Sequence, residues 1–100
     1  MNTFAELFRK YRLRAEFGSL SEIADAFAEK GYFYDLSIFC LWQKGKRVPH
    51  KRQVLLILVE VFIENGAISS LEKANEFLES AGHGYLTKDE QIKFQQMDIM

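Results

Sequence analysis

Cysteine and proline are almost missing from this chain of 100 residues, which contains one of each. A single cysteine, Cys40, cannot form an internal disulfide, so the chain has no disulfide framework and fits a reducing compartment. Internal repeats, low-complexity segments and interdomain linkers are absent as well. We therefore expect one domain over residues 1–100.

No hydrophobic run is long enough to cross a bilayer. The longest, from Val54 to Ile63, is interrupted by Glu60 and falls well short of the roughly 20 residues that a membrane span needs. The first residues also lack the apolar stretch of a signal peptide. These absences predict a cytoplasmic protein that has no membrane contact.

The sequence signatures of an enzyme are missing too. The two histidines, His50 and His83, stand apart from each other and from Cys40, which argues against a metal site. No pair of carboxylates is placed as acid and base catalysis would need, and there is no glycine-rich phosphate loop. We expect no enzymatic activity, no cofactor and no metal ion.

The net charge is only −1, but its distribution is uneven. Residues 1–52 carry ten Lys or Arg and six Asp or Glu, a balance of +4, whereas residues 53–100 carry three and eight, a balance of −5. The low net charge argues against a strongly basic nucleic-acid binder. The asymmetry favours a polyanion or an acidic partner for the first half, with chance unevenness as the alternative.

Capping boxes divide the chain into helices. In this motif a Ser or Thr precedes a Glu by three residues, and it marks the start of a helix. Apolar residues, which make up 48% of the chain, recur at helical spacing after each box. The pattern predicts helices from Thr3 to about Ala15, Ser19 to Gly31, Ser69 to about Ala81 and Thr87 to about Met97. We expect Ile92 to pack in the last helix, and the tail at 98–100 to fray.

Two further helices are predicted in the middle of the chain. Asp35 is a plausible N-cap for a helix from Leu36 to Lys44, in which Phe39 and Trp42 share the buried face. The apolar run from Val54 to Ile63 has no periodicity that separates a helix from a strand. Its length favours a helix from about His50 to Glu64. Such a helix needs cover on more than one side, so we place it at the centre of the core, with any excess facing another subunit.

The helix that contains Trp42 ends in a distinctive way. The order is Trp42-Gln43-Lys44-Gly45-Lys46-Arg47-Val48-Pro49, in which glycine stops the helix, proline prevents its continuation and cations lie between them. This segment and the helix order before it resemble the helix-turn-helix domain of lambda-repressor-like, or XRE, regulators. The resemblance covers roughly residues 3–66. Residues 67–97 look like a C-terminal helical extension, in which Ala74-Asn75 and Ala81-Gly82 match an extension of some family members more weakly.

The resemblance implies an all-α, lambda-repressor-like bundle of about five to six short helices. It further implies a transcriptional regulator that binds double-stranded DNA as a homodimer, with half-sites roughly 34 Å apart or a multiple of that. Helix 36–44 would enter the major groove and the basic corner at 44–52 would grip phosphates. About five phosphate contacts per subunit would give a slope of log affinity against log salt of roughly −4 to −5. The implied DNA-binding residues are Leu36, Ser37, Ile38, Leu41, Gln43, Lys44, Lys46, Arg47, His50, Lys51 and Arg52.

The sequence departs from this family at the positions that would read bases. Major-groove edges are read by hydrogen-bonding side chains, and among the groove positions only Ser37 fits well. Family members often have a phosphate-contacting Gln where Leu20 stands. The apolar face of Leu36, Ile38 and Leu41 could contact thymine methyl groups, pack on the aromatic connector at 32–34, or bind another protein. A helix-turn-helix fold used as a protein-protein interaction module is therefore the alternative function.

Overall fold

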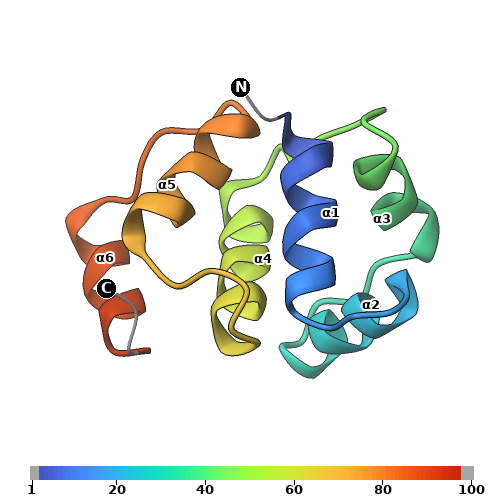
Figure 1. Ribbon diagram of the computed structural model, residues 1–100, viewed down its shortest axis with the longest axis horizontal. Helices are drawn as coiled ribbons and strands as arrows, with labels where there is room; N and C mark the ends of the chain where they lie inside the picture. Colours follow the sequence, from blue (N-terminus) through green and yellow to red (C-terminus); the bar gives the residue numbers. More distant parts are fainter. Residues whose placement is uncertain (1–2, 98–100) are drawn as a thin grey trace.

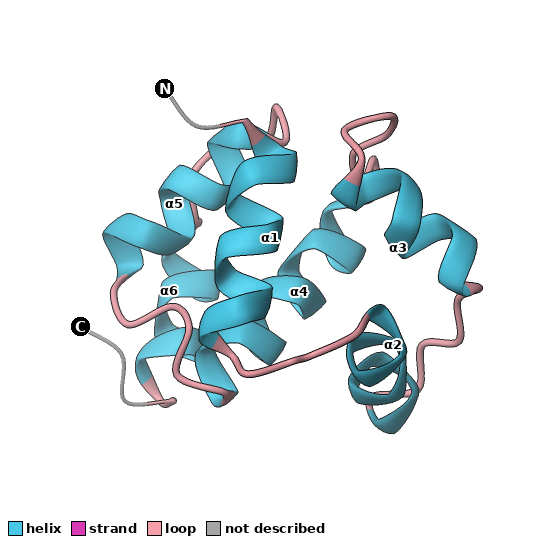
Figure 2. Ribbon diagram, turned by 45° about the vertical axis from the view of Figure 1, so that its right-hand side comes forward, coloured by secondary structure: helices cyan, strands magenta, loops and turns pink. Residues whose placement is uncertain are grey.

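Six helices make up the part of the chain that the computed structural model describes, residues 3–97. No strand occurs among these residues, so the all-α class is confirmed. Helices α1 and α4 lie side by side in the middle, with α2 and α3 on one side and α5 and α6 on the other (Figures 1 and 2). The expected fraying at 98–100 falls outside the described residues. The bounds are α1 Phe4–Arg14, α2 Leu20–Glu29, α3 Leu36–Gln43, α4 Arg52–Glu64, α5 Leu71–Ser80 and α6 Lys88–Gln95.

Two of the predicted capping boxes are complete. The amide of Glu6 donates to Thr3 Oγ1 at 3.2 Å, and the amide of Thr3 donates to Glu6 Oε1 at 2.9 Å. These bonds to the Thr3 backbone and side chain lower the pKa of Glu6, because they favour its ionised form. Thr87 and Glu90 repeat the arrangement at 3.3 and 2.9 Å. Ser19 is the N-cap residue of α2, and its amide donates to Glu22 Oε2 at 3.2 Å.

Two predicted helix starts were wrong. The cap of α5 is Ser70, not Ser69, and its Oγ accepts from the amide of Lys73 at 3.2 Å. Ser70 is still extended (φ −150°, ψ 156°), so the first helical residue is Leu71 and Ser70 is the residue placed to cap the first turn. Helix α4 begins at Arg52 rather than His50, because the chain stays extended after Pro49 through the N-cap Lys51 (φ −80°, ψ 125°).

The core is built around α4, as predicted. The Phe62 ring of α4 lies 6.2 Å from Phe8 and 5.8 Å from Tyr11 of α1, and 5.7 Å from Phe77 of α5, measured between ring centroids. Burial raises the pKa of Tyr11. Apart from Phe62, the buried residues of α4 are all aliphatic. They are Val54, Leu55, Ile57, Leu58, Val59, Val61 and Ile63.

The expected apolar excess on α4 is absent. Eight of its residues are buried within the chain itself, and Leu56, which is partly exposed, also packs against the core. Helices of the same chain therefore cover most of the apolar surface of α4, and a contact of this helix with another subunit stays a prediction.

Glu60, the polar residue in the apolar run, lies where three helices meet. The ammonium of Lys30, just beyond α2, is 3.5 Å from Glu60 Oε2 and 2.8 Å from Glu64 Oε1, and Lys93 Nζ of α6 is 3.8 Å from Glu60 Oε1. Partial burial lowers the pKa of Lys30, but its contacts with Glu64 and Glu60 outweigh this and the net shift is upward. The carboxylate therefore has partners that allow it to lie in the core helix.

The packing residue of α6 is not the predicted one. Ile92 is 54% exposed, whereas Phe94 is 1% exposed. Ile92 and Phe94 are two residues apart, which puts them on opposite sides of a helix, and Phe94 is on the side that faces the core.

Candidate nucleic-acid interface

One side of α3 is anchored in the core. Phe39 is fully buried and Trp42 is 4% exposed. The Trp42 ring lies edge-on to Phe8 of α1 at 6.2 Å, and Phe39 lies edge-on to Phe27 of α2 at 5.1 Å. Edge-to-face ring pairs of this kind add stability beyond the burial of area. The prediction that these two residues are core is confirmed.

Among residues 3–97, no helix lies over the other side of α3. Helices α5 and α6 lie on the far side of α1 and α4 from α3 (Figures 1 and 2). Leu36 is 48% exposed and Ser37 is exposed, while Cys40 and Leu41 are half-buried. Ile38 differs from Leu36, because it packs against the core and lines a hollow that Tyr34 also lines. Ile38 is therefore partly covered by the core, whereas Leu36 stays open, and packing of this face on the aromatic connector stays a prediction.

The turn after α3 has the geometry that the sequence predicted. Gly45 has a φ of +76°, in the left-handed region. Its amide donates to the Trp42 carbonyl at 3.2 Å, and the amide of Lys46 donates to the Leu41 carbonyl at 2.9 Å. These two bonds form the Schellman motif, which ends a helix and favours glycine at this position. The chain is thereby turned so that the residues after Gly45 leave α3 sharply.

The bend between α3 and α4 carries cations that form no ion pair with the described residues, 3–97. No carboxylate of residues 3–97 lies within ion-pair distance of Lys44, Lys46, Arg47 or Lys51, and all four are exposed. His50 is exposed beside them. Helix α5, whose sequence includes Glu72, Glu76 and Glu79, lies across α1 and α4 from α3 (Figure 1). The bend is therefore a surface where positive charge is not neutralised by the described part of the chain, which favours binding of an anion.

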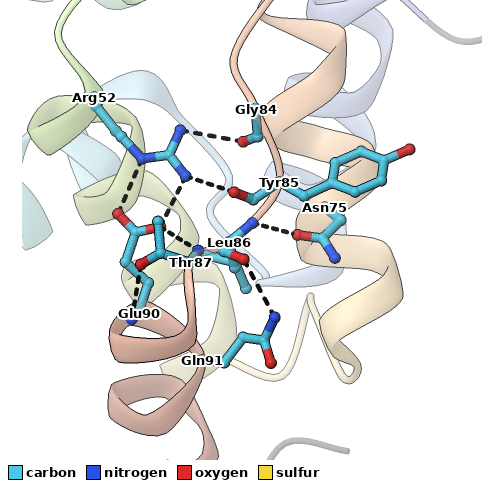
Figure 3. Close-up of polar contacts among 8 residues, drawn as sticks. All are labelled: Arg52, Asn75, Gly84, Tyr85, Leu86, Thr87, Glu90 and Gln91. Atoms are coloured by element: carbon cyan, nitrogen blue, oxygen red, sulfur yellow. Dashed lines mark hydrogen bonds and ion pairs between the residues drawn. The ribbon is translucent and has the colours of Figure 1, made fainter.

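Arg52, the last residue of the predicted basic corner, does not belong to this surface. Its Nε and Nη2 donate to the two carboxylate oxygens of Glu90 at 2.9 and 2.8 Å. Its Nη1 and Nη2 also donate to the carbonyls of Gly84 and Tyr85 at 3.1 and 3.0 Å (Figure 3). The guanidinium turns toward α6 because a bidentate carboxylate satisfies its planar fork. These contacts engage the guanidinium within the chain, which disfavours the phosphate contact expected for Arg52.

The side chain of Gln43 also forms a hydrogen bond within the chain. Its Oε1 accepts from Arg12 Nε at 2.9 Å, and Arg12 Nη1 donates to the Phe17 carbonyl at 2.8 Å. These bonds tie the end of α3 to α1 and to the α1–α2 loop. Leu20 stands at the start of α2, where lambda-repressor-like regulators often have a Gln. It is half-buried against the core, so packing accounts for an apolar residue there.

A hollow of about 340 Å³, which was not predicted from the sequence, lies beside the bend. Its walls are apolar or aromatic and come from the connector before α3, from α3, from the bend and from α4: Tyr34, Ile38, Trp42, Val48, Pro49 and Val54. Arg47, His50 and Lys51 complete its lining. No local sequence signal marks this hollow, because its residues meet only when four segments pack together.

Residues 3–97 include no cluster of three side chains able to hold a metal ion. In the same range no helix is long and apolar enough to span a membrane. Comparison with protein-family models, with curated proteins and with solved structures found no match to this chain.

Proposed function

We propose that this protein binds double-stranded DNA through α3 and the cationic bend at 44–51, as a helix-turn-helix regulator of the lambda-repressor-like kind. In this proposal α2 and α3 form the motif, and the outer side of α3 faces the major groove. The strongest support is one arrangement: α3 is anchored by Trp42 and Phe39, and the cations that follow it have no carboxylate partner among the described residues.

The chemistry of the surface favours phosphate contact over base reading. Lys and Arg side chains bind phosphates regardless of sequence, whereas base edges need hydrogen-bonding groups inside the groove. Ser37 is the only exposed side chain of that kind on the first turn of α3, next to the apolar Leu36. We therefore propose that affinity comes from the bend and that α3 adds apolar contacts with thymine methyl groups.

A titration of a fluorescently labelled duplex at low salt tests this function. We expect binding that weakens steeply as salt increases, because each neutralised phosphate releases a counterion. Reversing two charges with Arg47→Glu and Lys51→Glu should abolish it. The matched control is Lys73→Glu with Lys88→Glu. It changes the net charge by the same amount as the test variant, but at positions on α5 and α6. Absence of binding at tens of micromolar protein would refute the proposal for this chain.

We also propose that the DNA-binding form is a homodimer. Two copies would contact half-sites about one helical turn, roughly 34 Å, apart. Light scattering on the complex with a palindromic duplex should then give two chains per duplex. One chain per duplex at saturation would contradict the dimer without affecting the DNA-binding proposal.

A protein-protein module is the second candidate function, favoured by a specific apolar edge. Phe33, in the connector before α3, is 81% exposed, and Leu36, the first residue of α3, is 48% exposed. Exposed apolar patches on soluble proteins often mark interaction surfaces. Under this alternative, a purified partner would lose binding with Leu36→Asp and keep it with Arg47→Glu, which is the reverse of the pattern expected for DNA.

A further inference from the structure

The hollow beside the bend combines apolar walls with cationic side chains in its lining. Its floor and walls are apolar: Trp42 is 4% exposed, Val54 is 6% exposed, and Ile38 and Val48 pack against the core. Its volume of about 340 Å³ lies within the range of sites for small molecules, roughly 300–1,000 Å³. A ligand that fills it can remove apolar surface from water without any rearrangement of the core.

The charges at the edge of the hollow have one sign. Arg47 and Lys51 line it beside His50, and no Asp or Glu of residues 3–97 does. Neither Arg47 nor Lys51 forms an ion pair with a carboxylate of residues 3–97. An incoming carboxylate would therefore meet cations that are not already neutralised, whereas an amine would be repelled.

We propose that this hollow binds a small amphipathic acid, with the apolar tail against Trp42, Val48 and Val54 and the carboxylate at Arg47 and Lys51. The class is a monocarboxylic acid of about the size of a medium-chain fatty acid. Both halves of the molecule are needed. A charged head alone gains little binding free energy from ion pairs at an exposed rim, and an apolar body alone forms no ion pair with the cations.

Occupation of the hollow opposes DNA binding. Arg47 and Lys51 are the same side chains that the proposed function places on phosphates, so acid and duplex compete for them. This second half of the inference rests on the proposed function. The first half, binding of the acid to the free protein, is measured without DNA, so failure of one is distinguishable from failure of the other.

The only tryptophan of the chain, Trp42, lines the hollow and reports on it directly. Titration with octanoate should change the Trp42 fluorescence saturably. Butyrate, which has the same head and a shorter tail, should bind more weakly by up to about fourfold per missing buried methylene. Octan-1-ol, which has the same tail length and no charge, should also bind more weakly. Methyl resonances of Ile38, Val48 and Val54 should shift with the octanoate titration.

A variant that lacks the two cations separates their contribution to octanoate binding from that of the apolar walls. Arg47→Gln with Lys51→Gln should weaken octanoate binding by about three- to tenfold, as loss of two exposed ion pairs implies. The control Lys73→Gln with Lys88→Gln removes the same charge from α5 and α6 and should leave octanoate binding unchanged. A response that does not saturate, that octan-1-ol reproduces equally, or that both variants weaken equally would overturn the site.

A second titration tests the competition. Octanoate at saturating concentration should raise the apparent dissociation constant of a labelled duplex, and the increase should disappear in the Arg47→Gln, Lys51→Gln variant. If octanoate binds at Trp42 and the duplex affinity is unchanged, the displacement is refuted and the site stands. If the duplex does not bind at all, the proposed function fails, and the fluorescence titration still decides the site.

Discussion

Arg52 and Glu90, which are 38 residues apart in the chain, form a bidentate pair with bonds of 2.8 and 2.9 Å. The same carboxylate caps α6 by accepting from the amide of Thr87 at 2.9 Å. The pair therefore joins the first residue of α4 to the first turn of α6 (Figure 3). This contact holds the C-terminal helices against the first four, and it removes Arg52 from the surface of the bend.

Glu90→Gln should destabilise the fold in a pH-dependent way. The hydrogen bonds from Arg52 lower the pKa of Glu90 from 4.5 to about 2. The carboxylate thus contributes stability that is fully present above pH 4.5 and is lost as pH falls toward 2. We expect the variant to lose about 1–3 kcal/mol of unfolding free energy at pH 7. Chemical denaturation at several pH values measures this, and a gap between the two proteins that stays constant down to pH 2 would contradict it.

Gly45→Ala should lower stability although its side chain has room. The nearest atom to a Cβ built at Gly45 is Ala5 Cβ at 3.6 Å, an ordinary contact, so the cost comes from the φ of +76°. A residue with a Cβ in this conformation costs about 1 kcal/mol. Gly84→Ala is the control, because no left-handed φ occurs there and nothing lies within 4 Å. Thermal unfolding of the two variants should differ, and equal melting temperatures would refute this explanation.

Leu36→Asp and Ile38→Asp should have different effects. Leu36 is 48% exposed, so a charge there should change the unfolding free energy by less than about 0.5 kcal/mol. Ile38 packs against the core, and its replacement by Asp should cost about 2 kcal/mol or more. Urea denaturation compares them. Leu36→Asp is then the variant with which to test surface binding, and a large loss of stability in it would show that Leu36 is not an open position.

Local signals were sufficient to predict most of the fold. Thr3 and Thr87 cap helices as their spacing to Glu6 and Glu90 indicated, because these bonds form within one turn. The turn at Gly45 and the inward position of Trp42 were also predictable, since a helix stop and an apolar face are both local patterns. The all-helical class follows from these elements.

The errors arose where distant segments meet. Arg52 has the same local sequence environment as Lys51, and only the position of Glu90 decides that it is paired. Likewise, the hollow beside the bend forms only because Tyr34 and Val54, which are far apart in the sequence, line the same space. Sequence patterns contain no direct record of such contacts.

The salt dependence of duplex binding tests the central claim most directly. With Arg52 excluded, the cations Lys44, Lys46, Arg47 and Lys51 predict a slope of log affinity against log salt of about −3 to −4 per chain. Arg47→Gln should reduce the magnitude of the slope by about 0.9, the contribution of one phosphate contact. Arg52→Gln should lower stability and leave the slope unchanged. Salt-independent binding, or an equal change of slope in the two variants, would contradict the account.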